Sequence, residues 1–299
     1  MKRVVVLLTL LLTPALAGCA NAGATGPGGV RVVAAENFWG SIAAQLGGAR
    51  AQVLSIIVNP AQDPHAYEPN SSDARAMATA QLAIVNGVGY DPWAPKLLAA
   101  DPAGGRAVLT VGSLFGLHEG DNPHRWYDPA EVESVAGAIT ADLKRSDPRH
   151  AAYFDRRLRA FETRGLAPYH AQIALIRRRY AGVPVGASES IFALQAPSLG
   201  LNLITPAGFM KAVSEGAEVI AKDTAAAESQ LTERRIKVWI YNPQNVTPEI
   251  QRCNRLARAQ RIPIATVTET LSPASDSFEQ WQVRQLQGIA AALGRATGR

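Results

Sequence analysis

Residues 148–182, PRHAAYFDRRLRAFETRGLAPYHAQIALIRRRYAG, form one long stretch without a strand pattern, and this stretch decides the fold. Its apolar side chains recur at about helical spacing among many arginines. We predict one long helix with a kink near Pro168, close to Gly165. Two shorter surface helices are the alternative, because proline often breaks a helix. The apolar positions are Tyr153, Leu158, Phe161, Leu166, Tyr169, Ile173, Ile176 and Tyr180.

Strand and helix patterns alternate on both sides of this stretch. Before it, strands are predicted over 30–35, 52–58, 82–85 and 107–111, and helices over 38–46, 71–80, 92–100 and 128–143. After it, strands are predicted over 183–187, 201–205, 237–241 and 263–267, and helices over 190–199, 225–235, 248–260 and 277–293. Such alternation indicates βα units and parallel sheets. The expected fold class is α/β, with an N-terminal lobe over 30–147, a linker helix over 148–182 and a C-terminal lobe over 183–299.

The N-terminal residues have the pattern of an export signal. Lys2 and Arg3 precede an apolar run over 4–12, which is too short to cross a bilayer, and small residues lead to Cys19. Leu16-Ala17-Gly18-Cys19 resembles the bacterial lipobox, which implies a lipoprotein signal peptide over 1–18 and a lipid on Cys19. An ordinary signal peptide cleaved near Ala17 is the alternative. Residues 19–29 are then expected to be a flexible tether.

Composition excludes some classes of protein. The formal net charge of +5 falls to +3 once Lys2 and Arg3 are removed with the signal peptide, and the charges are scattered. This balance gives no support for nucleic-acid binding. Cys253 is the one cysteine besides Cys19, so no intrachain disulfide is expected, and its helical surroundings favour a small core residue.

Two loops each present a histidine directly after a proline. The first is Asp63-Pro64-His65-Ala66-Tyr67-Glu68-Pro69, and the second is Asn122-Pro123-His124-Arg125-Trp126-Tyr127-Asp128-Pro129. Each loop follows a predicted strand, and ligands collect at the carboxyl ends of parallel strands. A rigid turn with an incidental histidine is the plain alternative for one such loop. Two similar loops favour a pair of ligands.

These two loops, together with Asn86-Gly87 and the downstream Trp93, resemble the signatures of metal-binding lipoproteins that feed manganese and zinc ABC transporters. The resemblance covers nearly the whole mature chain. It implies two α/β lobes joined by a rigid backbone helix, with four side chains at the lobe interface that hold one divalent ion. The two histidines would be His65 and His124.

The resemblance places the other two ligands in the second half. One follows the first strand there, at Glu189, and the other follows the last strand, where Glu269 stands in place of the usual Asp. Asp276 is the reserve candidate for the latter, although a helix-capping role suits it better. Glu189 could instead simply open a helix, since acidic residues suit the first turn. Asn122 stands where the family often has Asp, which affects a partner of His124 rather than a ligand.

Two imidazoles and two carboxylates favour Mn²⁺, with Zn²⁺ or Fe²⁺ as alternatives, because oxygen donors prefer harder ions. The expected function is that of an extracytoplasmic solute-binding protein, a monomer anchored by lipid to the bacterial cell membrane, which delivers the ion to an ABC permease. An enzyme is not expected. A membrane-tethered metallohydrolase would need an open coordination position, and no Gly-x-Ser-x-Gly, His-Glu-x-x-His or phosphate-loop motif occurs. A surface adhesin is a further alternative.

Overall fold

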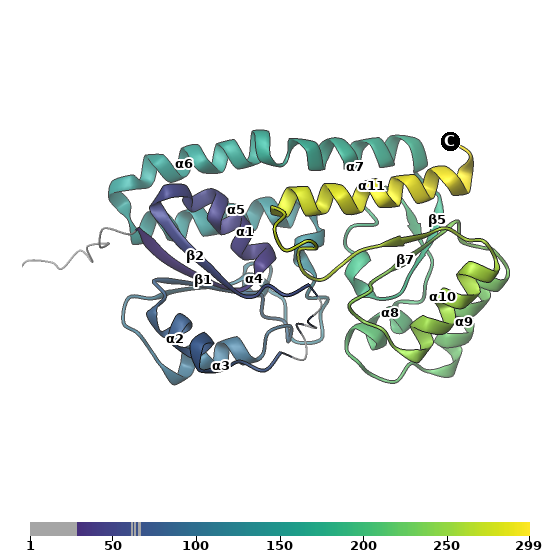
Figure 1. The fold of residues 1–299 in the computed structure, drawn as a ribbon, viewed down its shortest axis with the longest axis horizontal. Helices are drawn as coiled ribbons and strands as arrows, with labels where there is room; N and C mark the ends of the chain where they lie inside the picture. Colours follow the sequence, from purple (N-terminus) through teal and green to yellow (C-terminus); the bar gives the residue numbers. More distant parts are fainter. Residues whose placement is uncertain (1–28, 61, 63, 65–66) are drawn as a thin grey trace, which may run out of the picture.

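The computed structural model describes residues 29–60, 62, 64 and 67–299, which form two parallel sheets flanked by helices. The sheets lie at opposite ends of the molecule, and a long helical segment runs past both (Figure 1). The α/β fold class with two lobes is therefore confirmed. The signal peptide, Cys19, most of the tether and His65 lie outside the described residues.

The first sheet has the strand order β2-β1-β3-β4, and every pair of neighbours is parallel. Successive residues of β1 face opposite sides, as a pleated strand requires. Val32 and Ala34 join the core under α1 and α5, whereas Val33 and Ala35 join a second core under α2 and α3. The elements are β1 (Val30–Glu36), α1 (Asn37–Gly47), β2 (Ala51–Ile57), α2 (Ser71–Thr79), β3 (Leu82–Val85), α3 (Trp93–Ala100), β4 (Ala107–Thr110), α4 (Val111–Leu114) and α5 (Pro129–Ser146).

The second sheet repeats this arrangement with the order β6-β5-β7-β8, again parallel throughout. Trp239 on the central strand β7 is fully buried, and its indole N–H donates to Asn254 Oδ1 of α10 at 2.8 Å. Cys253 is buried beside it, as expected of a small core residue. The elements are β5 (Pro184–Ala187), β6 (Asn202–Leu203), α8 (Ala207–Ser214), α9 (Ala221–Thr232), β7 (Val238–Tyr241), α10 (Pro248–Ala259), β8 (Ile264–Thr266) and α11 (Phe278–Thr297).

The stretch between the sheets is helical from Pro148 to Tyr180, with one irregular turn. After a 3-10 turn (Pro148–His150), α6 (Ala151–Ala160) leads into a π turn (Phe161–Gly165) and then α7 (Ala167–Tyr180). The amide of Leu166 donates to the carbonyl of Phe161 at 2.8 Å, five residues back. Pro168 lies in the first turn of α7, where its missing N–H breaks no helical bond. The interruption is therefore a π turn that ends before Pro168, and the kink near Pro168 stays a prediction.

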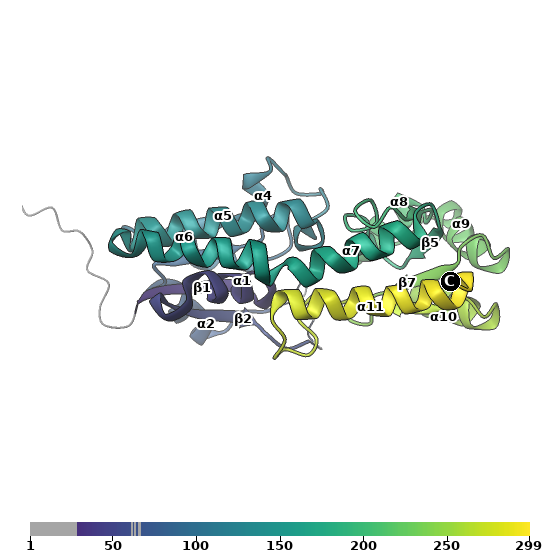
Figure 2. The ribbon, with the colours of Figure 1, turned by 90° about the horizontal axis from the view of Figure 1, so that it is seen from above.

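The C-terminal helix α11 lies alongside α7 in both views (Figures 1 and 2). The Tyr169 and Phe278 rings meet edge to face at 6.2 Å. At its start, α11 is also bonded to the first lobe, because Ser41 Oγ accepts from the Phe278 amide at 2.9 Å and Gln45 donates to Glu279 at 2.9 Å. The α6–α7 segment and the helix α11 thus both connect the two lobes.

The weakest sequence predictions fall between 190 and 235. The helix expected over 190–199 is wrong: a 3-10 turn (Ser190–Phe192) is followed by irregular turns up to Gly200. Pro197 has no N–H to continue a helical ladder, and Gly200 has a φ of +66°. The strand expected over 201–205 shortens to β6, α8 was not foreseen, and α9 begins four residues earlier than predicted. Among the described helices, none combines the length and apolar character needed to span a membrane.

Candidate metal centre

The carboxyl ends of both sheets lead into the space between the lobes. His124 belongs to the segment that follows β4 and α4, Glu189 comes two residues after β5, and Glu269 comes three residues after β8. In open parallel sheets this edge is where ligands bind. All three side chains are buried, with exposures of 0%, 0% and 2% for His124, Glu189 and Glu269.

The imidazole of His124 is held in one orientation by its own loop. Asn122 Oδ1 accepts from the His124 backbone amide at 3.1 Å and from Nδ1 at 2.8 Å. Because an amide oxygen can only accept, Nδ1 carries the proton and Nε2 is the unprotonated ring nitrogen. The ring packs edge-on against Trp126 at 5.2 Å and Tyr90 at 5.9 Å. Burial lowers the pKa of His124 from 6.5 to about 4, so the ring is neutral at pH 7.

The Glu189 carboxylate accepts three hydrogen bonds inside the second lobe. The donors are Asn242 Nδ2 to Oε1, and Asn245 Nδ2 at 3.0 Å and Ser214 Oγ at 3.5 Å to Oε2. Burial first, and then the charge of Glu269, raise the pKa of Glu189 from 4.5 to about 8. Glu189 precedes the Ser190–Phe192 turn, but its side chain makes no capping bond there. Opening a helix is therefore not the role of this carboxylate.

Glu269 contacts both lobes. Its Oε1 accepts from Asn242 Nδ2 at 3.1 Å, and its Oε2 accepts from the Tyr90 hydroxyl at 2.8 Å and lies 3.4 Å from His124 Nε2. Asp276 lies elsewhere, because its carboxylate pairs with the Arg284 guanidinium at 3.0 and 3.1 Å. The expected capping role of Asp276 is wrong, since Ser277 caps α11.

Sequence reasoning missed the loop that holds these carboxylates together. We name residues 242–245, Asn-Pro-Gln-Asn, the amide loop. Gln244 Oε1 accepts from the Glu269 amide at 2.5 Å, and Gln244 Nε2 donates to the Pro60 carbonyl of the first lobe at 2.7 Å. The available signal was three amide side chains directly after the predicted strand 237–241, at the edge where ligands collect.

The three described candidates lie next to one another but do not form a closed cage. His124 and Glu269 are in direct contact, whereas Glu189 and Glu269 are joined through the Asn242 amide. No three His, Cys, Asp or Glu side chains among residues 29–60, 62, 64 and 67–299 are grouped closely enough to hold an ion by themselves. The fourth candidate, His65, lies outside these residues.

A buried acid pair supports the first-lobe side of the centre. The Asp91 carboxylate accepts from the amides of Asn86 and Gly87 at 2.7 and 2.8 Å, directly after β3. Burial and the neighbouring Asp91 charge raise the pKa of Glu36, at the end of β1, well above its ordinary value of 4.5. The Asn86 side chain donates in turn to the Pro123 carbonyl at 3.0 Å. The strand ends thereby fix the loop that carries His124.

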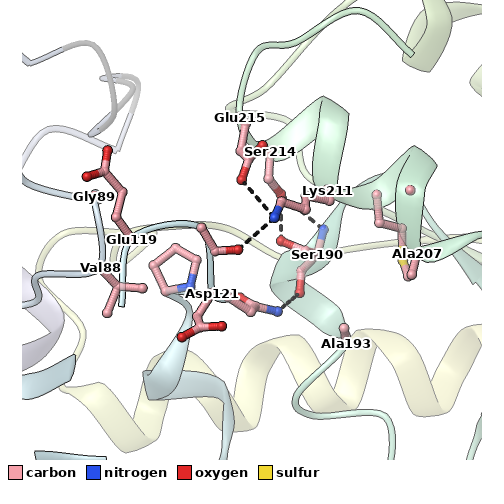
Figure 3. A pocket seen from close by; sticks show the side chains of 15 residues that line it. Val88, Gly89, Glu119, Asp121, Ser190, Ala193, Ala207, Lys211, Ser214 and Glu215 are labelled. Carbon is pink, nitrogen blue, oxygen red and sulfur yellow. Dashed lines mark hydrogen bonds and ion pairs between the residues drawn. The ribbon is translucent and has the colours of Figure 1, made fainter. Parts of the chain in front are cut away.

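A cleft of about 860 Å³ opens between the lobes beside this centre (Figure 3). Asn122 and Ser214, which contact His124 and Glu189, lie in its lining. Two hydrogen bonds cross it: Lys211 Nζ donates to the Gly120 carbonyl at 2.7 Å, and Asn122 Nδ2 donates to the Ser190 carbonyl at 2.8 Å. Through Asn122 and Ser214 the cleft borders the buried candidates, which are not themselves in its lining.

Comparisons with known proteins identify the family. Residues 32–292 match the family model of the periplasmic component A of zinc-uptake complexes. The chain is 30% identical over 154 residues to the manganese-binding lipoprotein MntA of Halalkalibacterium halodurans, covering 50% of this chain and 51% of the relative. It is 26% identical over 179 residues to the iron-binding protein YfeA of Yersinia pestis, covering 56% and 53%. The chain thus spans about half the length of the curated relatives it matches.

The fold is also that of a solved structure. The cadmium-bound periplasmic metal-binding protein of Candidatus Liberibacter asiaticus superposes with a TM-score of 0.73 at 17% identity, covering 88% of this chain and 99% of the other. At this identity the likeness concerns the fold alone. The family match spans most of the chain, and the relatives named above are binding proteins rather than enzymes. The chain therefore belongs to the family of periplasmic component A of zinc-uptake complexes.

Proposed function

We propose that this protein captures a divalent transition-metal ion outside the membrane and delivers it to an ABC transporter permease. The observation that carries the proposal is the buried unit of His124, Glu269, Asn242 and Glu189 between the two lobes. The Glu189 carboxylate forms no ion pair with Lys or Arg anywhere in the described part of the chain. Buried carboxylates are usually paired or bind metals, so a cation between these groups would relieve their repulsion.

The proposed ligands are His65, His124, Glu189 and Glu269. His124 has the neutral ring and the oriented Nε2 that a metal ligand needs. Glu189 and Glu269 supply oxygen atoms from the second half of the chain. His65 is included because its Pro-His loop repeats the pattern of the His124 loop.

For the ion we propose manganese, with zinc and iron as alternatives. Two of the four donors are carboxylates, which suit Mn²⁺ and Fe²⁺ better than a site with three imidazoles would. The names of the relatives include manganese-binding and iron-binding proteins, and the family is named after zinc uptake. Zn²⁺ would still compete strongly in solution, because the Irving–Williams order places it above Mn²⁺.

We further propose that Cys19 carries a lipid and holds the protein at the outer face of the bacterial cell membrane, as a monomer beside its permease. The lipobox-like Leu16-Ala17-Gly18-Cys19 supports the anchor. The cleft beside the centre supplies a route for the ion, with Asn122, Ser190 and Ser214 in its lining. The proposed division into a lobe over 30–147, a linker over 148–182 and a lobe over 183–299 places ligands in both lobes.

Thermal unfolding of chelator-stripped protein tests the proposal. An ion that binds the folded state raises its stability by about 2.7 kcal/mol at a concentration 100 times Kd. Mn²⁺ or Zn²⁺ should therefore raise the Tm of the wild type and of Asp276→Asn, but leave Glu269→Gln nearly unchanged. The Asp276 variant is the matched control, because its carboxylate pairs with Arg284 instead. Absence of any shift with all first-row divalent ions would exclude metal binding.

Elemental analysis of protein purified without chelators, together with Glu189→His, tests the choice of ion. If manganese is the cargo, the purified wild type carries it, and Glu189→His shifts the preference towards zinc. Zinc as the sole bound ion, with no effect of Glu189→His, would contradict the manganese proposal while leaving metal binding intact.

A further inference from the structure

Two acidic side chains meet at the carboxyl ends of the central strands of the first lobe. Glu36 is the last residue of β1, and Asp91 lies in the turn that follows β3. Both are buried, with exposures of 0% and 1%, and their side chains bond to each other. Neither forms an ion pair with Lys, Arg or His in the described part of the chain. Two buried acids without a cation repel when both are ionised, so this pair favours a single negative charge.

The surroundings of the pair place the proton on Glu36. Asp91 Oδ2 accepts from the Asn86 amide at 2.7 Å, and Oδ1 accepts from the Gly87 amide at 2.8 Å, which stabilises the ionised form of Asp91. Neither oxygen of Glu36 has a hydrogen-bond donor aligned with it among the described residues. Its partner across the strand pair is Ile57 of β2, which is apolar. A neutral Glu36 whose O–H donates to the Asp91 carboxylate therefore suits both groups.

The turn over 86–91 connects this pair to the candidate centre. The Tyr90 hydroxyl, next to Asp91 in the sequence, donates to Glu269 in the second half of the chain at 2.8 Å. At the other end of the turn, Asn86 Nδ2 donates to the Pro123 carbonyl at 3.0 Å, in the second Pro-His loop. A second negative charge beside Asp91 would disturb this turn, and the change would reach both the loop and the carboxylate.

We propose that Glu36 is a positioning residue that acts as a neutral carboxylic acid: its O–H donates to the Asp91 carboxylate and so holds the turn over 86–91 in place. Burial first, and then the Asp91 charge, raise the pKa of Glu36 well above 4.5, which agrees with this role. Glu36 then acts on the centre through the turn, without binding the ion. The effect on ion binding rests on the proposed function, whereas the protonation of Glu36 does not.

NMR of protein labelled with ¹³C in the glutamate side-chain carboxyl groups tests the protonation. Glu36→Gln removes one carboxyl signal from the spectrum and so assigns it. We expect the Glu36 signal at pH 7 to have the chemical shift of a neutral acid, and to move to the carboxylate value only at higher pH. Glu228→Gln is the matched control: its carboxylate pairs with Arg252, so the signal that it removes should be that of an ionised group. A Glu36 signal with the carboxylate shift at pH 7 would overturn the inference.

Kd values for Mn²⁺ and Zn²⁺, measured by competition with a chelating dye, test the positioning role. Glu36→Gln keeps a neutral donor towards Asp91 and should bind both ions as the wild type does. Glu36→Leu removes the donor and should weaken binding by about 10- to 100-fold, the range typical of groups behind metal ligands. If Glu36→Leu does not fold, Glu36→Met replaces it with the same expectation. No loss for the apolar variant, or an equal loss for Glu36→Gln, would overturn the positioning role. A wild type that binds neither ion would instead overturn the proposed function, while the NMR result would still decide the protonation of Glu36.

Discussion

Raising the pH of the metal-free protein from 6.5 to 8 should destabilise it through Glu189. This carboxyl titrates near 4.5 in an unfolded chain and at about 8 in the fold, because burial and the Glu269 charge oppose its ionisation. Between these values the folded state holds one more proton than the unfolded state. The stability associated with that proton is complete below pH 4.5 and is lost as the pH rises through 8.

Through His124, a rise in pH instead increases the stability of the folded state, and it does so over a lower pH range. Its pKa falls from 6.5 to about 4 on folding, so the unfolded chain holds the extra proton and stability rises with pH between these values. The two effects largely cancel from pH 4.5 to 6.5, and above 6.5 the Glu189 effect remains. At about 1.4 kcal/mol per pH unit, Glu189 then removes about 2 kcal/mol between pH 6.5 and 8.

Urea unfolding in the presence of a chelator, at both pH values, measures this loss. Glu189→Gln removes the titration while keeping a neutral side chain of the same shape, so the wild type should lose about 2 kcal/mol more than the variant. The comparison also removes the contribution of Glu36, whose raised pKa is common to both proteins. Equal losses in the two proteins would refute the reasoning. A saturating divalent ion should abolish the wild-type loss, because the ion replaces the proton.

Three further substitutions are expected to lower the free energy of unfolding. Tyr90→Phe removes the hydroxyl that donates to Glu269, which should cost about 1.5–3 kcal/mol in urea unfolding and weaken Mn²⁺ or Zn²⁺ binding in a titration. Trp126→Ala should cost about 3–5 kcal/mol, measured by the same unfolding assay, because the buried indole stacks on Phe38 at 3.9 Å. Asp128→Ala should cost about 1 kcal/mol and lower the Tm, since the carboxylate caps α5 by accepting from the amides of Ala130 and Glu131.

Local signals were sufficient for most of the fold. Apolar runs located most of the strands, because both sheets are parallel and their central strands β1, β3, β5 and β7 are largely buried on both faces. Asp128 and Pro129 predicted the start of α5 correctly, because capping depends on neighbouring residues only. The segment around Pro197 differs from its predicted helix, because its apolar residues recur at helical spacing while the proline prevents a regular helix.

The candidate centre was less accessible to sequence reasoning. His124, Glu189 and Glu269 were named from motifs and a family resemblance, but their environment depends on contacts between distant parts of the chain. Tyr90 and Glu269 are 179 residues apart, and nothing local to either predicts their bond. The position of Asn242 between Glu189 and Glu269 follows from the order of β5, β7 and β8 in space, which local sequence patterns do not reveal.

The π turn (Phe161–Gly165) affects how α7 is rotated about the helix axis relative to α6. Such a turn inserts one extra residue into a helix, and one residue of α-helix corresponds to a rotation of about 100°. Because the wide turn takes up this residue locally, α7 keeps the rotation that a regular helix one residue shorter would give it. A regular α-helix over the same residues would instead turn α7 by about 100° relative to α6. A segment that contributes no candidate ligand thus sets the rotation of α7 relative to α6.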